Sequence, residues 1–489
     1  MTDLLVVLPV LLPALASLIY AVLGWTRVTQ WLGAGCAAAV LATGVALASA
    51  GGTPSAAGGL LRVDALSAFM VIVIGAVALI AGLAGPPYLA AEIAAGHGTP
   101  RTADLHNVLV QAFLAAMALA VVAANLGLVW VAIEATTIVT AFLVGQRRNR
   151  PALEAAWKYV VICSVGIAVA FLGTVLLNYA SVHAGRGAGL DWTALAGTAG
   201  DLDPGVTRIA VALLVIGFGT KAGLAPLHAW LPDAHSQAPA PVSALMSGVL
   251  LSVAFYAILR VKAIADGALG TGFSRTLLVA VALATLLVAA SLLIAQRDYK
   301  RMLAYSSIEH MGLLALGAAV GTRPAVAAVL LHVLGHGLTK ATLFVGAGRI
   351  LQTTRSSRID GVRGLAGSQP VLAGAFGAGV LALLGLPPFS LFASEVGIAR
   401  AGFAGGLGWA VAIALVLLLV IGAAVLARTG RMLLGPPPDG PGAATAPVPL
   451  PGGTALAVVA GLTACAALGV TLGPLHDLLQ TAAGIVGTP

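Results

Sequence analysis

Apolar runs of about 20 residues follow one another along almost the whole chain, and no other feature constrains the fold as strongly. A helix of about 20 residues is needed to cross the hydrocarbon core of a bilayer, where every backbone polar group must be bonded within the protein. Hydrophobic residues make up 60% of the 489 residues and charged residues only 9%, whereas soluble domains carry about 25% charged residues. The sequence therefore predicts an all-α, polytopic membrane protein.

The length and spacing of these runs predict about fourteen transmembrane helices. Their expected ranges are 4–24, 30–50, 65–85, 106–123, 126–145, 155–180, 208–231, 240–261, 275–295, 302–320, 325–350, 371–399, 407–427 and 454–473. The first run has no basic segment before it and no obvious small-residue cleavage site. We therefore expect a retained helix and not a signal peptide.

The basic residues report on topology and not on a nucleic-acid partner. The net charge is +8, but the basic residues are spread over short loops and form no single patch. Cytoplasmic loops carry an excess of Lys and Arg, and the excess falls on the inner side when the N-terminus is placed outside. We expect a multi-pass protein of the cell membrane with both termini outside, in contact with lipid and with no nucleic acid.

The cysteines and glycines give no sign of a redox or nucleotide site on this chain. Cys36, Cys163 and Cys465 lie far apart in apolar runs, and no CxxC or close Cys/His spacing occurs. No glycine-rich phosphate loop stands between a strand and a helix. We therefore expect no cofactor, metal or catalytic redox group on the chain itself. The low-complexity segment Pro436–Pro451 is predicted to be a loop.

Lys221 lies in the middle of an apolar span, after the stretch 209–216. A charge at the centre of a bilayer costs about 3 kcal/mol on insertion scales. Gly223 and Pro226 follow directly and can interrupt a helix, and broken helices at membrane depth usually line polar cavities or ion sites. A lysine near a helix end that reaches the interface is the alternative; a buried, titratable lysine on a broken helix is favoured.

Further ionisable residues fall inside the predicted spans or near their ends. Glu154 and Lys158 are four residues apart, the favourable spacing for an ion pair on one helix face. His332, His336 and Lys340 follow one another at steps of four, so they share one face of a helix. The residues predicted to carry protons are Glu134, Lys158, Lys221, His228, His332, His336, Lys340 and Glu395.

Each of these groups also has a structural interpretation. Glu134 could be a buried acid bonded to backbone, Glu154 could cap its helix, and a single histidine is more often a packed core residue than a site. The series as a whole favours a lateral proton relay, because each buried charge needs a partner or a local water. Acids, histidines and lysines can all take up and release protons.

The segment Gly223–Leu227 is similar in sequence to Gly385–Phe389. Each segment combines glycine and proline and lies beside one buried charge, Lys221 before the first and Glu395 after the second. Two interrupted spans in corresponding positions are typical of transporters built from repeated halves. The first of these spans is expected to run inward and the second outward, as an inverted repeat requires.

Three strings resemble the antiporter-like subunits of complex I (NuoL, NuoM, NuoN), of Mrp-type cation/proton antiporters and of membrane-bound hydrogenases. They are Lys221–His235, Ala238–Ala244 and Asp298–Ser307. The resemblance covers residues from about 105 to 430. Within this family, Trp157–Tyr159, Ser307–Gly312 and the segment ending at Glu395 are most similar to hydrogenase-4 component F-like subunits of formate hydrogenlyase-like group 4 hydrogenase complexes.

The resemblance implies fourteen helices, of which 4–8 and 9–13 form two inverted five-helix repeats and 7 and 12 are broken. The corresponding divisions are 1–104, 105–262, 263–430 and 431–489, the last a Pro-rich loop and a C-terminal helix. It also implies that Glu134 on helix 5 pairs with Lys221 on helix 7. The helix 11 group of His332, His336 and Lys340 would connect the two half-channels, with Glu395 on the exit side.

Two positions depart from this pattern or extend it. Many relatives carry a lysine or histidine on helix 8 where Ser252 stands here, and a serine cannot store a proton at neutral pH. The relay would have to cross that gap by water, by His228 or His235, or by Lys158. Glu309 and His310 form a possible subgroup-specific site.

The expected function is proton translocation within a redox-driven membrane complex, as a non-redox subunit of a hydrogenase or an NADH:quinone oxidoreductase-like enzyme. The resemblance implies a nickel–iron centre and iron–sulfur clusters on partner subunits, which would include other membrane subunits and peripheral hydrogenase or dehydrogenase subunits. One alternative is an Mrp-type monovalent cation/proton antiporter subunit. Another is a scaffold subunit that does not conduct protons. Ser252 is compatible with this alternative because it cannot store a proton.

Overall fold

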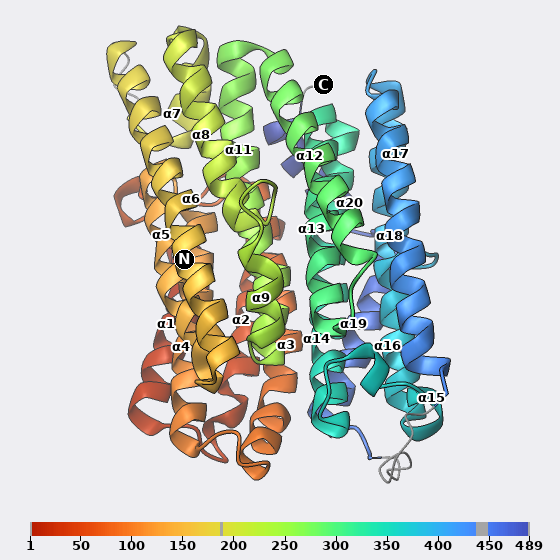
Figure 1. Ribbon diagram of the computed structural model, residues 1–489. Coiled ribbons are helices and arrows are strands. Elements are labelled where there is room, and N and C mark those ends of the chain that lie inside the picture. The colour runs from red at the N-terminus through yellow and green to blue at the C-terminus, as the bar shows by residue number, and fades with distance from the viewer. Residues whose placement is uncertain (1, 186–188, 437–447, 488–489) are drawn as a thin grey trace.

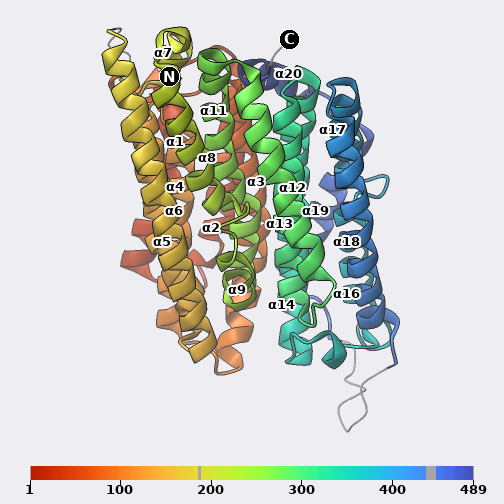
Figure 2. The ribbon, with the colours of Figure 1, turned by 45° about the horizontal axis from the view of Figure 1, so that its top comes forward.

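The computed structural model describes residues 2–185, 189–436 and 448–487, and most of them are helical. Figure 1 shows the helices side by side in one bundle. α5 (Leu126–Val144) and α6 (Arg150–His183) lie at one lateral end, and α17 (Ser390–Ala404) and α18 (Gly408–Leu434) at the other. The same order appears in the rotated view of Figure 2. The predicted all-α, multi-span membrane fold is confirmed.

Thirteen of the described helical segments are long and apolar enough to cross a membrane. Besides α5, α6 and α18, the main helices are α1 (Thr2–Leu23), α2 (Leu32–Ala50), α3 (Ala65–Ala94), α4 (Pro100–Val122), α8 (Pro204–Ala222), α11 (Leu251–Leu269), α12 (Thr271–Leu293), α13 (Tyr299–Val320), α14 (Arg323–Thr354), α16 (Pro370–Leu383) and α19 (Gly452–Val470). α10 (Ala240–Leu245), the π-helical turn η5 (Met246–Leu250) and α11 together form one span. The predicted span 371–399 is divided between α16 and α17, each too short to cross alone.

Short elements connect these helices. The two-residue strands β1 (Ser55–Ala56) and β2 (Leu61–Arg62) pair antiparallel between α2 and α3. The remaining elements are α7 (Trp192–Gly197), α9 (Trp230–Gln237), α15 (Leu365–Ser368), α20 (Leu475–Val486) and the 3-10 turns η1 (Thr29–Trp31), η2 (Ala57–Gly59), η3 (Gly145–Arg147), η4 (Ala199–Asp201) and η6 (Ile359–Gly361).

Both predicted breaks are present, between α8 and α9 and between α16 and α17. The two helices end in the same way. Gly223 and Gly385 have φ values of +77° and +61°. The next N–H, of Leu224 or Leu386, donates to the carbonyl five residues earlier, at 2.8 and 3.2 Å. This Schellman arrangement requires a left-handed residue, which glycine adopts without steric cost.

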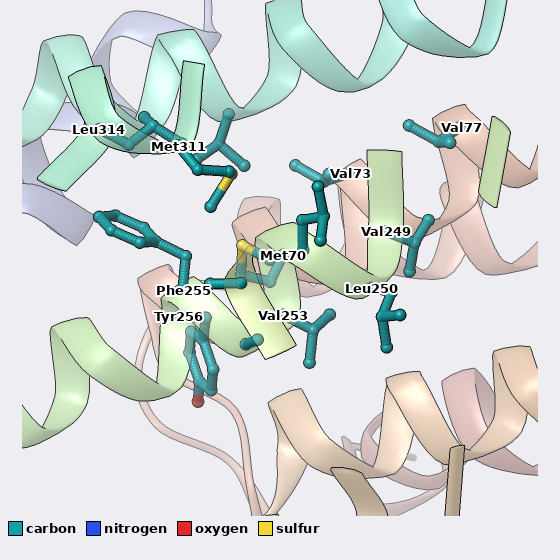
Figure 3. Close-up of a cluster of buried hydrophobic side chains, with 14 of the residues drawn as sticks. Met70, Val73, Val77, Val249, Leu250, Val253, Phe255, Tyr256, Met311 and Leu314 are labelled. Atoms are coloured by element: carbon teal, nitrogen blue, oxygen red, sulfur yellow. The ribbon is translucent and has the colours of Figure 1, made fainter. Parts of the chain in front are cut away.

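The centre of the bundle is an apolar core in which α3, η5, α11 and α13 meet (Figure 3). The side chains labelled there are Met70, Val73, Val77, Val249, Leu250, Val253, Phe255, Tyr256, Met311 and Leu314. α14 packs against α3, α13, α16, α17 and α19. Because α14 is surrounded in this way, its polar side chains face other parts of the protein and not lipid.

The C-terminal region contains two helices, α19 and α20, where the sequence analysis predicts one. α20 has one buried face, formed by Leu479, Ala482, Ala483 and Val486, and it packs against α3 and α14. At 12 residues α20 is too short to span a bilayer, which is why a search for long apolar runs does not find it. Most of the predicted loop Pro436–Pro451, residues 437–447, lies outside the described residues.

Candidate functional site

Lys221 occupies the last turn of α8 and is completely buried. Its Nζ donates to Thr137 Oγ1 at 2.6 Å and to the hydroxyl of Tyr159 at 2.9 Å. The ammonium also lies 4.8 Å from the centre of the Tyr159 ring, within range of a cation–π contact. Trp230, the first residue of α9, packs on Tyr159 and donates its indole N–H to the carbonyl of Thr220 at 2.8 Å. Trp230, directly after the break, therefore packs against the hydrogen-bond partner of the buried lysine.

Glu134 is linked to Lys221 by a single hydroxyl. Thr137 Oγ1 donates to Glu134 Oε2 at 2.9 Å and accepts from Lys221. Glu134 is partly buried on α5 and lines a mostly apolar cavity of about 650 Å³ between α4, α5 and α6. No direct ion pair of 4.0 Å or less joins Glu134 to Lys221 in the described residues, so Thr137 is the connection that sequence reasoning missed. Its position three residues after Glu134, on the same helix face, is the signal that could have found it.

Lys158 lies on the surface of this chain, with 45% of its side chain exposed. It pairs with Glu154 at 2.7 Å, as the spacing of four predicts, and with Asp233 at 3.0 Å. Asp233 also pairs with Arg301. These groups line a polar cavity of about 520 Å³. The sequence analysis treats Lys158 as a group inside a span; the structure instead puts it at the mouth of an open polar cavity.

His228 and His235 lie near the first break. His228 is partly buried in the non-helical segment between α8 and α9, and its Nδ1 has no hydrogen-bond partner in the described chain. His235, on α9, is fully buried; its Nδ1 bonds to the carbonyl of Leu231 at 3.0 Å, and its Nε2 has no partner there. Both imidazoles therefore have free hydrogen-bonding capacity close to the break.

Lys340 is the buried lysine of the second half, on α14. Its Nζ donates to the carbonyl of Leu303 at 2.6 Å and to Ser306 Oγ at 2.5 Å. Ser307 shares the Leu303 carbonyl at 3.2 Å and bonds to Ser247 of η5 at 2.9 Å. Two hydroxyls thus connect the span of α10, η5 and α11 to the Leu303 carbonyl, which accepts from both Ser307 and Lys340.

Ser252 does not take part in this connection. Its hydroxyl is buried and donates to the carbonyl of Gly248 within its own span, at 3.0 Å. Ser247, five residues earlier, makes the contact across to α13 instead. Because Ser247 lies in the π-helical turn, helical spacing counted from Ser252 does not identify it.

A histidine cluster fills the space between α13, α14 and α17. His310 Nδ1 lies 3.0 Å from His332 Nε2, and His332 Nδ1 lies 2.9 Å from Ser394 Oγ. The ring centres of His310 and His336 are 5.1 Å apart. Glu395 is partly buried, and its carboxylate lies close to Gly385, where an added Cβ would overlap it. The structure thus brings His332, His336 and Glu395 together, and His310 with them.

The two buried lysines form separate groups. In the described ranges, hydrogen bonds connect Lys221 to Thr137, Tyr159 and Glu134, and others connect Lys340 to Ser306, Ser307 and Ser247, but no direct hydrogen bond joins the two sets. Proton transfer between them would require water or side-chain movement, because a proton moves along continuous hydrogen-bonded contacts.

Comparison with known proteins identifies the family. The family described as NADH:quinone oxidoreductase/Mrp antiporter, transmembrane, matches residues 123–422. The chain belongs to this family. The Hydrogenase-4 component F homolog of Methylacidiphilum infernorum (isolate V4) is 40% identical over 372 residues, which cover 76% of this chain and 78% of that relative.

Solved structures show the same fold. A chain of the membrane-bound sulfane sulfur reductase, an archaeal respiratory membrane complex, superimposes with a TM-score of 0.83 at 24% identity, covering 99% of this chain and 97% of that one. A chain of the Mrp complex from Dietzia sp. DQ12-45-1b gives 0.82 at 23% identity, with the same coverage. The family match and the 40% identical relative make the chain an antiporter-like membrane subunit. The solved relatives are chains of multi-subunit membrane complexes.

Proposed function

We propose that this chain is the proton-translocating membrane subunit of a redox-driven, group 4 hydrogenase-like complex. The observation that carries the proposal is the fully buried ammonium of Lys221 at the end of a broken helix, one hydroxyl away from the Glu134 carboxylate. A buried charge in a bilayer is costly and usually functional. The 40% identity to a Hydrogenase-4 component F homolog supports the hydrogenase class.

In the first half, Thr137 supports direct exchange between the two charged groups. When the Lys221 ammonium releases a proton to Thr137 Oγ1, that hydroxyl passes its own proton to Glu134, and both charged groups become neutral. The reverse transfer restores the pair. Lys158, in the open polar cavity with Asp233, is a suitable group for proton uptake from the aqueous side. His228, with its free imidazole nitrogen, would relay protons near the break.

In the second half, protons would pass from Lys340 to His336 and His332 and leave past Glu395. The Ser247–Ser307 hydroxyl pair approaches Lys340 without using Ser252. The Leu303 carbonyl accepts from both Ser307 and Lys340 and cannot pass a proton on, so a water or a turn of the Ser307 hydroxyl would complete this crossing. The matching Schellman ends of α8 and α16 support two inverted repeats, 105–262 and 263–430. We propose that both termini face outward, as an even number of crossings and the positive-inside pattern require together.

Electron transfer in partner subunits would supply the energy. Nickel–iron and iron–sulfur centres would reside on those partners, and changes in their redox state would reset the Glu134–Lys221 pair. Any group that shifts this equilibrium must interact differently with the two protonation states. The lateral faces of α5 and α17 are the expected docking sites for neighbouring subunits, since they lie at the two ends of the bundle (Figure 1).

Replacing Thr137 by valine tests the connection between the two charges. Valine keeps the shape of threonine but removes the hydroxyl that links Lys221 to Glu134. We expect the rate of redox-driven proton pumping in membrane vesicles to fall about tenfold or more, as on loss of a general acid–base contact. The matched control is Thr136→Val, on the same helix, whose hydroxyl bonds only locally to Ile133. Equal pumping by both variants would exclude Thr137 as the bridge.

The second candidate is an Mrp-type cation/proton antiporter subunit, because the family that matches residues 123–422 includes Mrp antiporters as well as NADH:quinone oxidoreductases. Purification of the tagged chain in mild detergent should distinguish the two. We expect large and small hydrogenase subunits to co-purify with nickel and iron. Small membrane proteins without these metals, together with proton flux that depends on Na⁺ or K⁺ and needs no electron donor, would favour the antiporter.

A further inference from the structure

Three potential metal ligands from three helices meet in the second half of the bundle. They are His310 on α13, His332 on α14 and Glu395 on α17, and one ligand atom from each lies within 4.8 Å of the others. Both histidines are fully buried. The sequence analysis predicts no metal site because these residues are not close in sequence; folding alone brings them together.

We propose that His310, His332 and Glu395 form a Zn²⁺-binding site. Two imidazoles and one carboxylate, with water in the fourth position, are a ligand set that tetrahedral zinc uses in proteins. Mg²⁺ and Ca²⁺ prefer sets made of oxygen atoms, so the two imidazoles select against them. Glu395 is only partly buried, so the carboxylate side is the least enclosed side of the cluster.

The distances are suited to a small ion. His310 Nδ1 and His332 Nε2 are 3.0 Å apart. Two nitrogens bound tetrahedrally to zinc at about 2.0 Å are separated by roughly 3.3 Å. The nitrogen separation is therefore close to that of a zinc-bound pair, and both rings would turn so that their lone pairs face the ion. Glu395 supplies the negative charge that a divalent cation needs in a buried place.

Hydrogen bonds around His332 prepare its Nε2 for metal binding. The Ser394 hydroxyl donates its one hydrogen to the carbonyl of Leu391 at 2.9 Å, so it accepts from His332 Nδ1–H. The Nε2 of a neutral His332 then carries a free lone pair, directed at His310. An outer partner that fixes the tautomer in this way is typical of histidines that bind metals.

His310 can adapt to the ion without a change of charge. In the metal-free state its Nδ1–H donates to His332 Nε2. Metal binding requires that this proton leave Nδ1 and that Nε2 take one up. Glu309 Oε2 lies 3.8 Å from Nε2, so a small side-chain shift would bring it within hydrogen-bond distance. Glu309 would then be the outer partner of His310, which gives the Glu309–His310 pair a role.

The cluster also contains unused hydrogen-bonding capacity. His310 Nε2 and both ring nitrogens of His336 are buried without a hydrogen-bond partner in the described part of the chain. Buried polar groups normally have partners, and the ring of His336 lies next to that of His310. This second observation, independent of the ligand geometry, indicates that the cluster accommodates an additional polar species.

Zn²⁺ binding to the purified full-length chain in lipid nanodiscs tests the proposal. After a chelator wash, we expect the chain to bind one Zn²⁺ with higher affinity than any other site, measured by titration and metal analysis. His310→Gln and Glu395→Gln should each weaken this binding about tenfold or more, since loss of even an outer partner costs about 10- to 100-fold. His228→Gln, which removes an imidazole outside the cluster, is the matched control.

Equal weakening by His228→Gln, or unchanged affinity in both cluster variants, would overturn the site. X-ray absorption on the wild-type chain does not depend on how the variants fold. We expect two imidazole nitrogens and a carboxylate oxygen around zinc, and a shell of oxygen atoms alone would also overturn it.

A further consequence rests on the proposed function: bound Zn²⁺ should slow redox-driven proton pumping, reversibly with chelator, because it occupies relay residues. If bound zinc has the expected ligands but pumping is unchanged, the proton route past Glu395 is contradicted and the metal site is not. If zinc lacks this ligand shell but replacing Lys221 or Lys340 still abolishes pumping, the metal site is contradicted and the proton route is not.

Discussion

Replacing Lys221 by methionine is expected to abolish redox-driven proton pumping while the partner subunits continue to oxidise hydrogen or formate with an artificial dye. Methionine keeps much of the length and volume of lysine in this fully buried position, so the cavity cost of a truncation is avoided. It removes the only ammonium bonded to Thr137 and Tyr159 among the described residues, and with it the proton that Thr137 would pass to Glu134. Proton uptake by inverted membrane vesicles and dye reduction would be measured in parallel.

Arg208→Ala is the matched control for this variant. Arg208 lies on the same helix, α8, but its side chain is exposed, so its loss removes a positive charge without touching the buried group. Normal proton stoichiometry in Lys221→Met would exclude Lys221 from the relay. Loss of dye reduction as well would instead indicate that the complex fails to assemble, which the amount of co-purifying partner subunits would reveal.

Replacing Lys340 by methionine should lower pumping about 100-fold or more, the range expected when a proton-transfer group is lost. Lys340 is fully buried and is held by Leu303 and Ser306, beside the histidine cluster. Without its ammonium, the buried cation between the serine hydroxyls of η5 and α13 and the histidine cluster is lost. The measurement is again proton uptake against dye reduction, together with the recovery of the assembled complex.

Thr342→Val is the control for Lys340. Thr342 is buried on the same helix, and its hydroxyl bonds locally to Leu338, so the change preserves shape and removes a polar group outside the relay. Half of the normal proton stoichiometry in Lys340→Met would mean that the two halves of the chain move protons independently. Full stoichiometry would exclude Lys340 from the route.

Much of the fold could be predicted from the sequence because the bilayer imposes simple rules. Long apolar runs had to become spanning helices, and all the expected spans correspond to helices of the structure. Gly223 and Gly385 indicated both breaks, since a left-handed residue is needed at such a helix end. α20 was missed because the whole helix is only 12 residues long and its apolar face is buried against other helices.

The site was predictable in part, and for the same reason. Burying Lys221 or Lys340 in an apolar run is costly enough to mark each as a candidate site residue from the sequence, and both are fully buried in the structure. Lys158 is not buried in this way, because it lies at an open polar cavity and pairs with Asp233. Its expected role in the relay stays a prediction, as do the roles of the other relay residues.

The sequence by itself determined the membrane class, the number and limits of most spans, the two breaks and the buried lysines, because each depends on hydropathy or backbone preference over a short stretch. Only the tertiary structure decided which groups touch. Thr137 between Glu134 and Lys221, Ser247 against Ser307, and Glu395 beside His310 and His332 come from different helices. Such contacts depend on how the helices are rotated and packed against one another, which no local pattern in the sequence specifies.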